Sequence, residues 1–87
     1  MHDRPVLTVG ALAYLDAFLA IIPCKVLKIE GASGAPGVQL VTVKLTADRK
    51  AYKRGEILTD YGMHVIPRAA FYWRRSGARI GYYTVQA

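Results

Sequence analysis

The sequence has little that could cross-link a small domain. Cys24 is the only cysteine among 87 residues, so no disulfide can form within the chain and a disulfide-dense secreted scaffold is excluded. One cysteine, two histidines and six acidic residues also offer few ligands for a structural zinc site. We therefore expect no metal and no other cofactor. A chain of this length is expected to form one domain of modest stability.

Long hydrophobic runs are also absent. The apolar stretch over residues 6–22 contains Asp16 and is ended by Pro23, so it is too short and too interrupted to span a bilayer. The beginning of the chain lacks the basic region and small-residue cleavage site of a signal peptide. These features predict a cytoplasmic protein that has no membrane partner.

Acidic residues are scarce relative to basic ones. Twelve lysines and arginines stand against six acidic residues, which gives a net charge of +6. Residues 1–43 carry three charges of each sign, so the whole excess lies in residues 44–87. This asymmetry favours an anionic partner, either a nucleic acid or an acidic protein face.

The clearest secondary-structure signal is an alternation of apolar and polar residues after a glycine-rich loop. In "VTVKLT", Val41, Val43 and Leu45 share one face, which is typical of a half-buried strand. The loop "GASGAPG" (residues 31–37) separates this strand from "CKVLKI", so the two segments predict a hairpin with a long connection.

Further short strands are predicted from Ile57, at "HVIPR" and at "RIGYYTVQ", with turns every eight to twelve residues. This spacing predicts an all-β fold, a small barrel or sandwich of about five strands. Residues 1–7 are expected to form a flexible arm and residues 8–87 the single domain. The segment that begins at Thr8 is expected to be either a short helix or an extended lead-in that ends near Asp16.

A family resemblance rests on two motifs, "AYKRGEI" and "HVIPR". Their spacing resembles the SH3-like barrels of small bacterial and phage proteins, over about residues 23–68. The positions that carry the resemblance are Tyr52, Gly55, Glu56, Val65, Pro67 and Arg68. The lead-in "TVGALAYLDAFLAIIPCKVLKI" also resembles the start of small proteins of tailed bacteriophages. The resemblance implies an SH3-like barrel with an interaction role, but it implies no ligand, because this fold serves many functions.

Catalysis has weak support in the sequence. Cys24 lies in an apolar strand, where a buried inert thiol is the usual state. Ser33 and Ser76 occupy turns, and His64 opens a strand, which is an ordinary place for a structural histidine. We therefore expect a protein that is not an enzyme, with no catalytic residue and no small-molecule substrate.

The most informative feature is a basic and aromatic cluster near the carboxyl end. "AAFYWRR" is predicted to be either extended or a short helical turn. In the extended alternative, "FYWRR" (residues 71–75) and "RIGYY" (residues 79–83) flank a short turn and face each other as a hairpin. Trp, Tyr and Arg are enriched at protein interfaces, and aromatics beside basic residues also suit single-stranded nucleic acid. A structural alternative is that the aromatics fill the core while the arginines cover it.

The leading hypothesis is a protein-interaction module, phage-encoded, that acts as a virion component or as an inhibitor docking on a host protein. Its partner would be another protein or a second copy of the chain, in the host cytoplasm or in the virion. The predicted contact residues are Phe71, Tyr72, Trp73, Arg74, Arg75, Arg79, Tyr82 and Tyr83. The alternative is a nucleic-acid-binding module, with phosphates on Lys50, Lys53, Arg54, Arg74, Arg75 and Arg79 and bases stacked on Tyr72, Trp73, Tyr82 and Tyr83.

Overall fold

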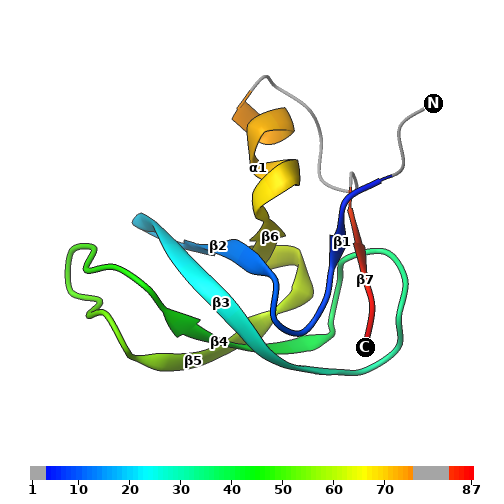
Figure 1. Ribbon diagram of the computed structural model, residues 1–87, viewed down its shortest axis with the longest axis horizontal. Coiled ribbons are helices and arrows are strands. Elements are labelled where there is room, and N and C mark those ends of the chain that lie inside the picture. The colour runs from blue at the N-terminus through cyan, green and yellow to red at the C-terminus, as the bar shows by residue number, and fades with distance from the viewer. Residues whose placement is uncertain (1–3, 76–82) are drawn as a thin grey trace.

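The computed structural model describes residues 4–75 and 83–87 (Figure 1). Its elements in chain order are β1 (Val6–Leu7), β2 (Leu12–Ala17), β3 (Ala20–Glu30), β4 (Leu40–Leu45), β5 (Ile57–Tyr61), the 3₁₀ turn η1 (Gly62–His64), β6 (Val65–Pro67), α1 (Arg68–Arg75) and β7 (Thr84–Val85). The prediction of a small all-β domain of about five strands is confirmed. No helix in the described ranges is long and apolar enough to cross a membrane.

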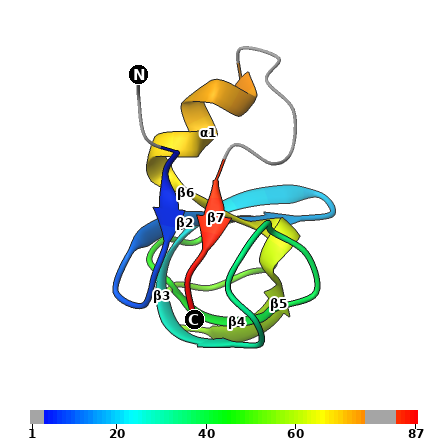
Figure 2. The same cartoon turned by 90° about the vertical axis from the view of Figure 1, so that its right-hand side faces the viewer.

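Five strands form one antiparallel sheet in the order β5-β4-β3-β2-β6. The central strand, β3, is 11 residues long and pairs with β2 on one side and β4 on the other. Its register with β4 shifts between Val26 and Lys28, and such a bulge bends the strand and increases its twist. The bent sheet curves around the core, and α1 lies beyond β6, next to β2 (Figures 1 and 2).

The core lies on one face of this sheet. The predicted alternation of Val41, Val43 and Leu45 is confirmed, since all three side chains are buried and pack together. Every other element except β5 and η1 contributes to the same buried cluster, which consists of Leu7, Ala13, Leu15, Ile22, Cys24, Val26, Val41, Val43, Leu45, Val65, Ile66, Ala70, Tyr83 and Val85.

The two ends of the described chain close the core together. β1 pairs in parallel with β7, and Figure 2 shows the two strands side by side over the sheet. The N–H of Gln86 donates to the Leu7 carbonyl at 2.9 Å, and the side chains of Leu7 and Val85 are buried. Val6 and Leu7, which the sequence analysis placed in a flexible arm, are therefore part of the fold.

The segment after Thr8 is extended, so the helical alternative for it is wrong. Gly10 has a φ of 90°, a left-handed conformation that glycine adopts at little cost, and it turns the chain between β1 and β2. β2 then pairs with both β3 and β6. Hydrogen bonding on both edges explains why strand pairing outweighs the helical spacing of Leu12, Leu15 and Leu19.

Residues 71–75 belong to the helix α1, so the helical alternative for this segment is confirmed and the extended arm of the hairpin with residues 79–83 is wrong. The helix begins directly after Pro67 with Ala69 and Ala70, which are strong helix formers. Ala70 is buried, and the Phe71 ring lies 4.3 Å from the Tyr14 ring between centroids. One side of the helix thus anchors to β2.

Gln39 organises the glycine-rich loop from a buried position. Its side-chain amide Nε2 donates to the carbonyls of Ala35 at 2.8 Å and Ala32 at 3.2 Å, while its Oε1 accepts from the N–H of Gly37 at 2.8 Å. The start of η1 packs directly on this amide, because a Cβ added at Gly62 would lie 2.5 Å from Gln39 Oε1. Only glycine fits at that point.

We expect Gly62→Ala to lower the free energy of unfolding by about 1–3 kcal/mol, since the added methyl group must displace the Gln39 amide. Gly37→Ala is the matched control. Its added Cβ would meet nothing closer than 3.9 Å and its N–H is retained, so urea denaturation should give a loss well below that of Gly62→Ala. Equal losses would contradict the close packing of η1 on Gln39.

Candidate functional site

The most exposed apolar side chains lie at the tip of the β2–β3 hairpin. Ala17 pairs with Ala20, so Phe18 and Leu19 form a two-residue turn. The side chain of Phe18 is 99% exposed and that of Leu19 is 72% exposed. We call these two residues the hairpin tip; in Figure 1 it projects from one end of the sheet, beside the β4–β5 loop.

The backbone preferences of tight turns do not explain why Phe and Leu occupy the hairpin tip. Two-residue hairpin turns favour residues with positive φ, above all Asn-Gly, because that backbone matches the twist of the strands. Lys50 is the one non-glycine residue with positive φ in the described ranges, so Phe18 and Leu19 adopt a less favoured turn. Neither backbone preference nor burial in this chain explains a Phe-Leu pair at this position.

A hollow of about 530 Å³ opens at the base of the hairpin tip. Two strands of the sheet, η1 and the β4–β5 loop surround it. This tip hollow is lined by Asp16, Ala17, Phe18, Tyr52, Asp60, Tyr61 and His64. A smaller apolar recess of about 340 Å³ adjoins it on the other side of Phe18, with Leu19, Ala20, Lys50, Ala51 and Tyr52 around it.

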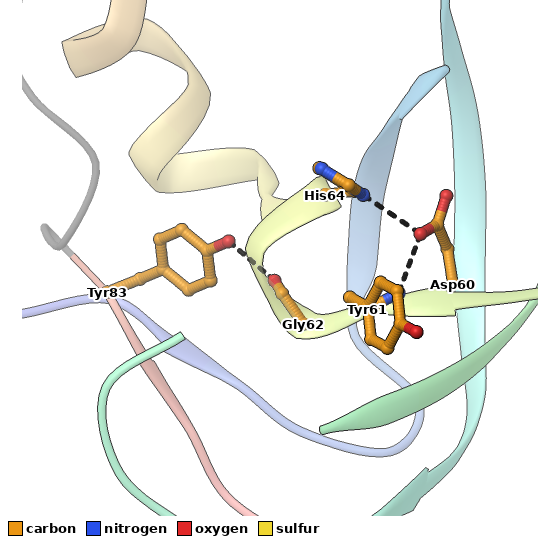
Figure 3. A network of polar contacts seen from close by, with 5 residues as sticks. All are labelled: Asp60, Tyr61, Gly62, His64 and Tyr83. Carbon is orange, nitrogen blue, oxygen red and sulfur yellow. Dashed lines mark hydrogen bonds and ion pairs between the residues drawn. The ribbon is translucent and has the colours of Figure 1, made fainter. Parts of the chain in front are cut away.

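Asp60 fixes the polar wall of the tip hollow (Figure 3). Its Oδ1 lies 2.9 Å from Nδ1 of His64 and accepts the backbone N–H of Tyr61 at 2.7 Å. Since an ionised carboxylate only accepts hydrogen bonds, the His64 tautomer is the one with hydrogen on Nδ1. Nε2 of His64 makes no hydrogen bond to the described part of the chain, which leaves one ring nitrogen for a partner.

The basic run of residues 48–54 is a tightly hydrogen-bonded loop. Asp48 Oδ1 accepts the backbone N–H of Arg54, and Glu56 Oε1 accepts that of Lys53, both at 2.7 Å. The acidic side chains are thus occupied by the backbone. Within the described residues, the side chains of Lys50, Lys53 and Arg54 therefore form no ion pair.

A second hollow of about 530 Å³ lies at the other side of this loop. Three of its lining residues are basic and none is acidic. This cationic hollow is lined by Lys25, Lys44, Leu45, Thr46, Arg54 and Gly55. It shares no residue with the tip hollow or with the recess beside it.

The predicted contact residues have different outcomes. Tyr83 is a core residue, only 3% exposed, whose hydroxyl donates to the Gly62 carbonyl at 2.7 Å (Figure 3), so its predicted contact role is wrong. Phe71 is half-buried against Tyr14. The side chains of residues 72–75, and residues 76–82 with Arg79 and Tyr82, lie outside the described residues. Among the predicted phosphate contacts whose side chains are described (Lys50, Lys53 and Arg54), only Arg54 lines the cationic hollow.

The sequence analysis did not identify the hairpin tip. It also missed Lys25 and Lys44, two of the three basic residues that line the cationic hollow. The turn at Phe18 and Leu19 contains none of the usual turn residues, so residues 6–22 read as one apolar run. Lys25 and Lys44 come together only through the register of β3 on β4. One signal in the sequence could have indicated this turn. Residues 6–22 form an apolar run that is longer than a typical single strand, so a turn within it was to be expected.

Comparisons with protein-family models, with curated proteins and with solved structures each find no match to this chain.

The single thiol, that of Cys24, lies in the core and lines neither the tip hollow nor the cationic hollow. Cys24 is buried in β3, and this burial raises the pKa of its thiol from an ordinary value of 9.0 to about 12, although a hydrogen bond with the Leu15 backbone acts in the opposite direction. The thiolate is the reactive form, so Cys24 is inert at neutral pH. Cys24, the only cysteine in the sequence, is therefore not a candidate nucleophile.

We expect Cys24 to make stability depend on alkaline pH. Above pH 9 the thiol ionises in the unfolded chain but stays protonated in the folded one, so the unfolded state binds fewer protons and stability falls as pH rises toward 12. The free-energy advantage of the wild type over Cys24→Ala should shrink by up to about 1.4 kcal/mol per pH unit in this window. Denaturant titrations of both proteins at several pH values measure this difference in the free energy of unfolding. A difference that stays constant with pH would contradict the raised pKa of Cys24.

Proposed function

We propose that this protein is a non-enzymatic protein-interaction module that contacts its partner through the hairpin tip. The observation that carries the proposal is the exposure of Phe18 and Leu19, at 99% and 72%, on a turn that does not require them. Full burial of a side chain of either type contributes about 1.5–3 kcal/mol. Two adjacent residues at the end of a hairpin can supply this energy by entering a pocket on a partner.

The surroundings of the tip support the same proposal. Tyr52, Tyr61 and His64 line the tip hollow, and aromatic residues are enriched at the cores of protein interfaces. The hollow would accept a side chain from the partner while the tip enters the partner's own pocket. Polar groups at its wall, such as Nε2 of His64, would fix the orientation of the two surfaces.

The composition of the tip hollow favours binding over catalysis. The pair of Asp60 and His64 provides an oriented imidazole, but the lining contains no Ser, Thr, Cys or Lys that the imidazole could activate. The SH3-like identity, the origin in a tailed phage and a location in the host cytoplasm or the virion remain proposals that rest on the sequence resemblance.

We expect Phe18→Ser to weaken partner binding by about 30-fold or more, which corresponds to about 2 kcal/mol, without lowering the thermal unfolding midpoint. Val38→Ser is the matched control, because Val38 is also apolar and is 80% exposed but lies in the glycine-rich loop. The partner is identified as a protein from the producing cells that both wild type and Val38→Ser retain. Titration calorimetry with the purified partner then gives the three affinities.

One result would contradict this function. If the double variant Phe18→Ser/Leu19→Ser binds the partner as tightly as wild type, the contact lies elsewhere on the protein. If wild type sediments as a dimer that Phe18→Ser converts to a monomer, the partner at the hairpin tip is a second copy of this chain.

A further inference from the structure

The cationic hollow places like charges opposite one another on the outer face of the sheet. Lys25 of β3 is the direct cross-strand partner of Lys44 of β4. Like charges directly opposite in a sheet destabilise it. Arg54 adds a third cation at the same hollow, from the loop that returns beside the end of β4 (Figure 1).

The neighbouring lysine on this face behaves differently. Lys28 pairs across the sheet with Thr42, and its Nζ lies 2.8 Å from Oε1 of Glu30. Lys25, Lys44 and Arg54 have no such acidic partner among the described residues. One cation on the outer face is therefore neutralised within the chain, whereas three around one hollow are left for an external anion.

The number and type of these donors favour phosphate. A lysine ammonium has three donors and an arginine guanidinium five, and Arg matches the oxygens of phosphate in a bidentate manner. The Thr46 side chain at the same hollow adds a hydroxyl. A phosphate group offers more acceptor oxygens to such a set than a single carboxylate does.

A second, smaller recess extends the surface toward α1. It measures about 210 Å³, shares Thr46 with the cationic hollow, and has Tyr14 and Arg68 in its lining. Tyr14 is half-buried and Arg68 is exposed. The two adjoining recesses together thus have four cations, a hydroxyl and an aromatic ring in their linings, namely Lys25, Lys44, Arg54, Arg68, Thr46 and Tyr14. Cations that follow a backbone, with an aromatic beside them, are the usual elements of a single-strand binding surface.

We propose that the cationic hollow of Lys25, Lys44 and Arg54 binds phosphate groups of a single-stranded nucleic acid, whose next nucleotide lies against Arg68 and Tyr14. This site is separate from the hairpin tip, so the chain has two independent surfaces. The phosphates provide the affinity, and the contact is independent of base sequence.

The test is fluorescence anisotropy with a labelled oligothymidine of roughly 12 nucleotides. We expect a Kd on the order of 1–100 µM near physiological salt, with three phosphate contacts weakening binding roughly 20-fold between about 50 and 200 mM salt. Lys25→Gln, Lys44→Gln and Arg54→Gln should each lower the magnitude of the salt slope by about 0.7 and weaken binding several-fold. Because all three side chains are exposed, the thermal unfolding midpoints should be unchanged or, for the two lysines, raised.

Lys28→Gln is the matched control, since it removes one positive charge from the same sheet face but from an ion pair with Glu30. It should leave both affinity and salt slope nearly at the wild-type values. An equal loss with Lys28→Gln would mean that only the overall charge matters, which overturns the site.

Two competitors identify the source of the anion. Inorganic phosphate should displace the oligothymidine more strongly than chloride at the same ionic strength, as expected for a phosphate site. A glutamate peptide of the same length should compete poorly. If the peptide binds as well as the oligothymidine, or if the oligothymidine does not bind at all, the surface is not a nucleic-acid site and the proposal fails.

Discussion

The parallel pairing of β1 with β7 is the constraint on which the rest of the structure depends. One face of the five-stranded sheet carries the core side chains. Two short strands from opposite ends of the described chain pack over that face and shield it from solvent. Leu7 and Val85 of this pair enter the core, and so does Tyr83, which directly precedes β7. The Tyr83 hydroxyl also reaches the Gly62 carbonyl, so the closing pair is tied to the η1 turn against which Gln39 packs. A contact between residues so far apart in sequence carries a large loop-closure entropy, which the burial of these side chains must offset.

This closure also decides where function can lie. Figure 1 shows β1 and β7 at one end of the molecule, with the hairpin tip and the β4–β5 loop at the other. Leu7, Tyr83 and Val85 at the closing end are buried, so Tyr83 serves the core although its type and neighbours suggest an interface. The far end is made of loops on a rigid sheet, where exposed side chains such as Phe18 and Arg54 contribute little to stability. Binding residues concentrate in such places because they can vary without unfolding the domain.

The sequence predicted those elements whose local signal agrees with the fold. The alternation through β4, the glycine-rich loop and the strand stop at Pro67 all follow from local rules, and the structure contains them. Where local and tertiary signals differ, the prediction failed. The turn at Phe18 has no turn residue, and α1 forms from aromatic residues because Ala70 and Phe71 pack on β2. The cationic hollow was out of reach for a different reason: the proximity of Lys25 to Lys44 depends on strand register, which no local pattern reveals.

The edge strand β5 carries a feature that opposes pairing with a further strand. β5 is the outer strand of the sheet, and Ile57 and Tyr61 are exposed on it, features that normally invite another chain to pair. The ladder with β4 uses the N–H of Gly62, which donates to the Gln39 carbonyl, so the N–H of Tyr61 is directed away from β4. The Asp60 carboxylate accepts that N–H and is itself held by His64. An incoming strand would have to displace this half-buried carboxyl group at the end of β5. The N–H of Tyr61 at this end of the edge is therefore protected by a side chain from its own strand, whereas nothing in the described chain covers Phe18. This contrast supports the proposal that a partner contacts the hairpin tip.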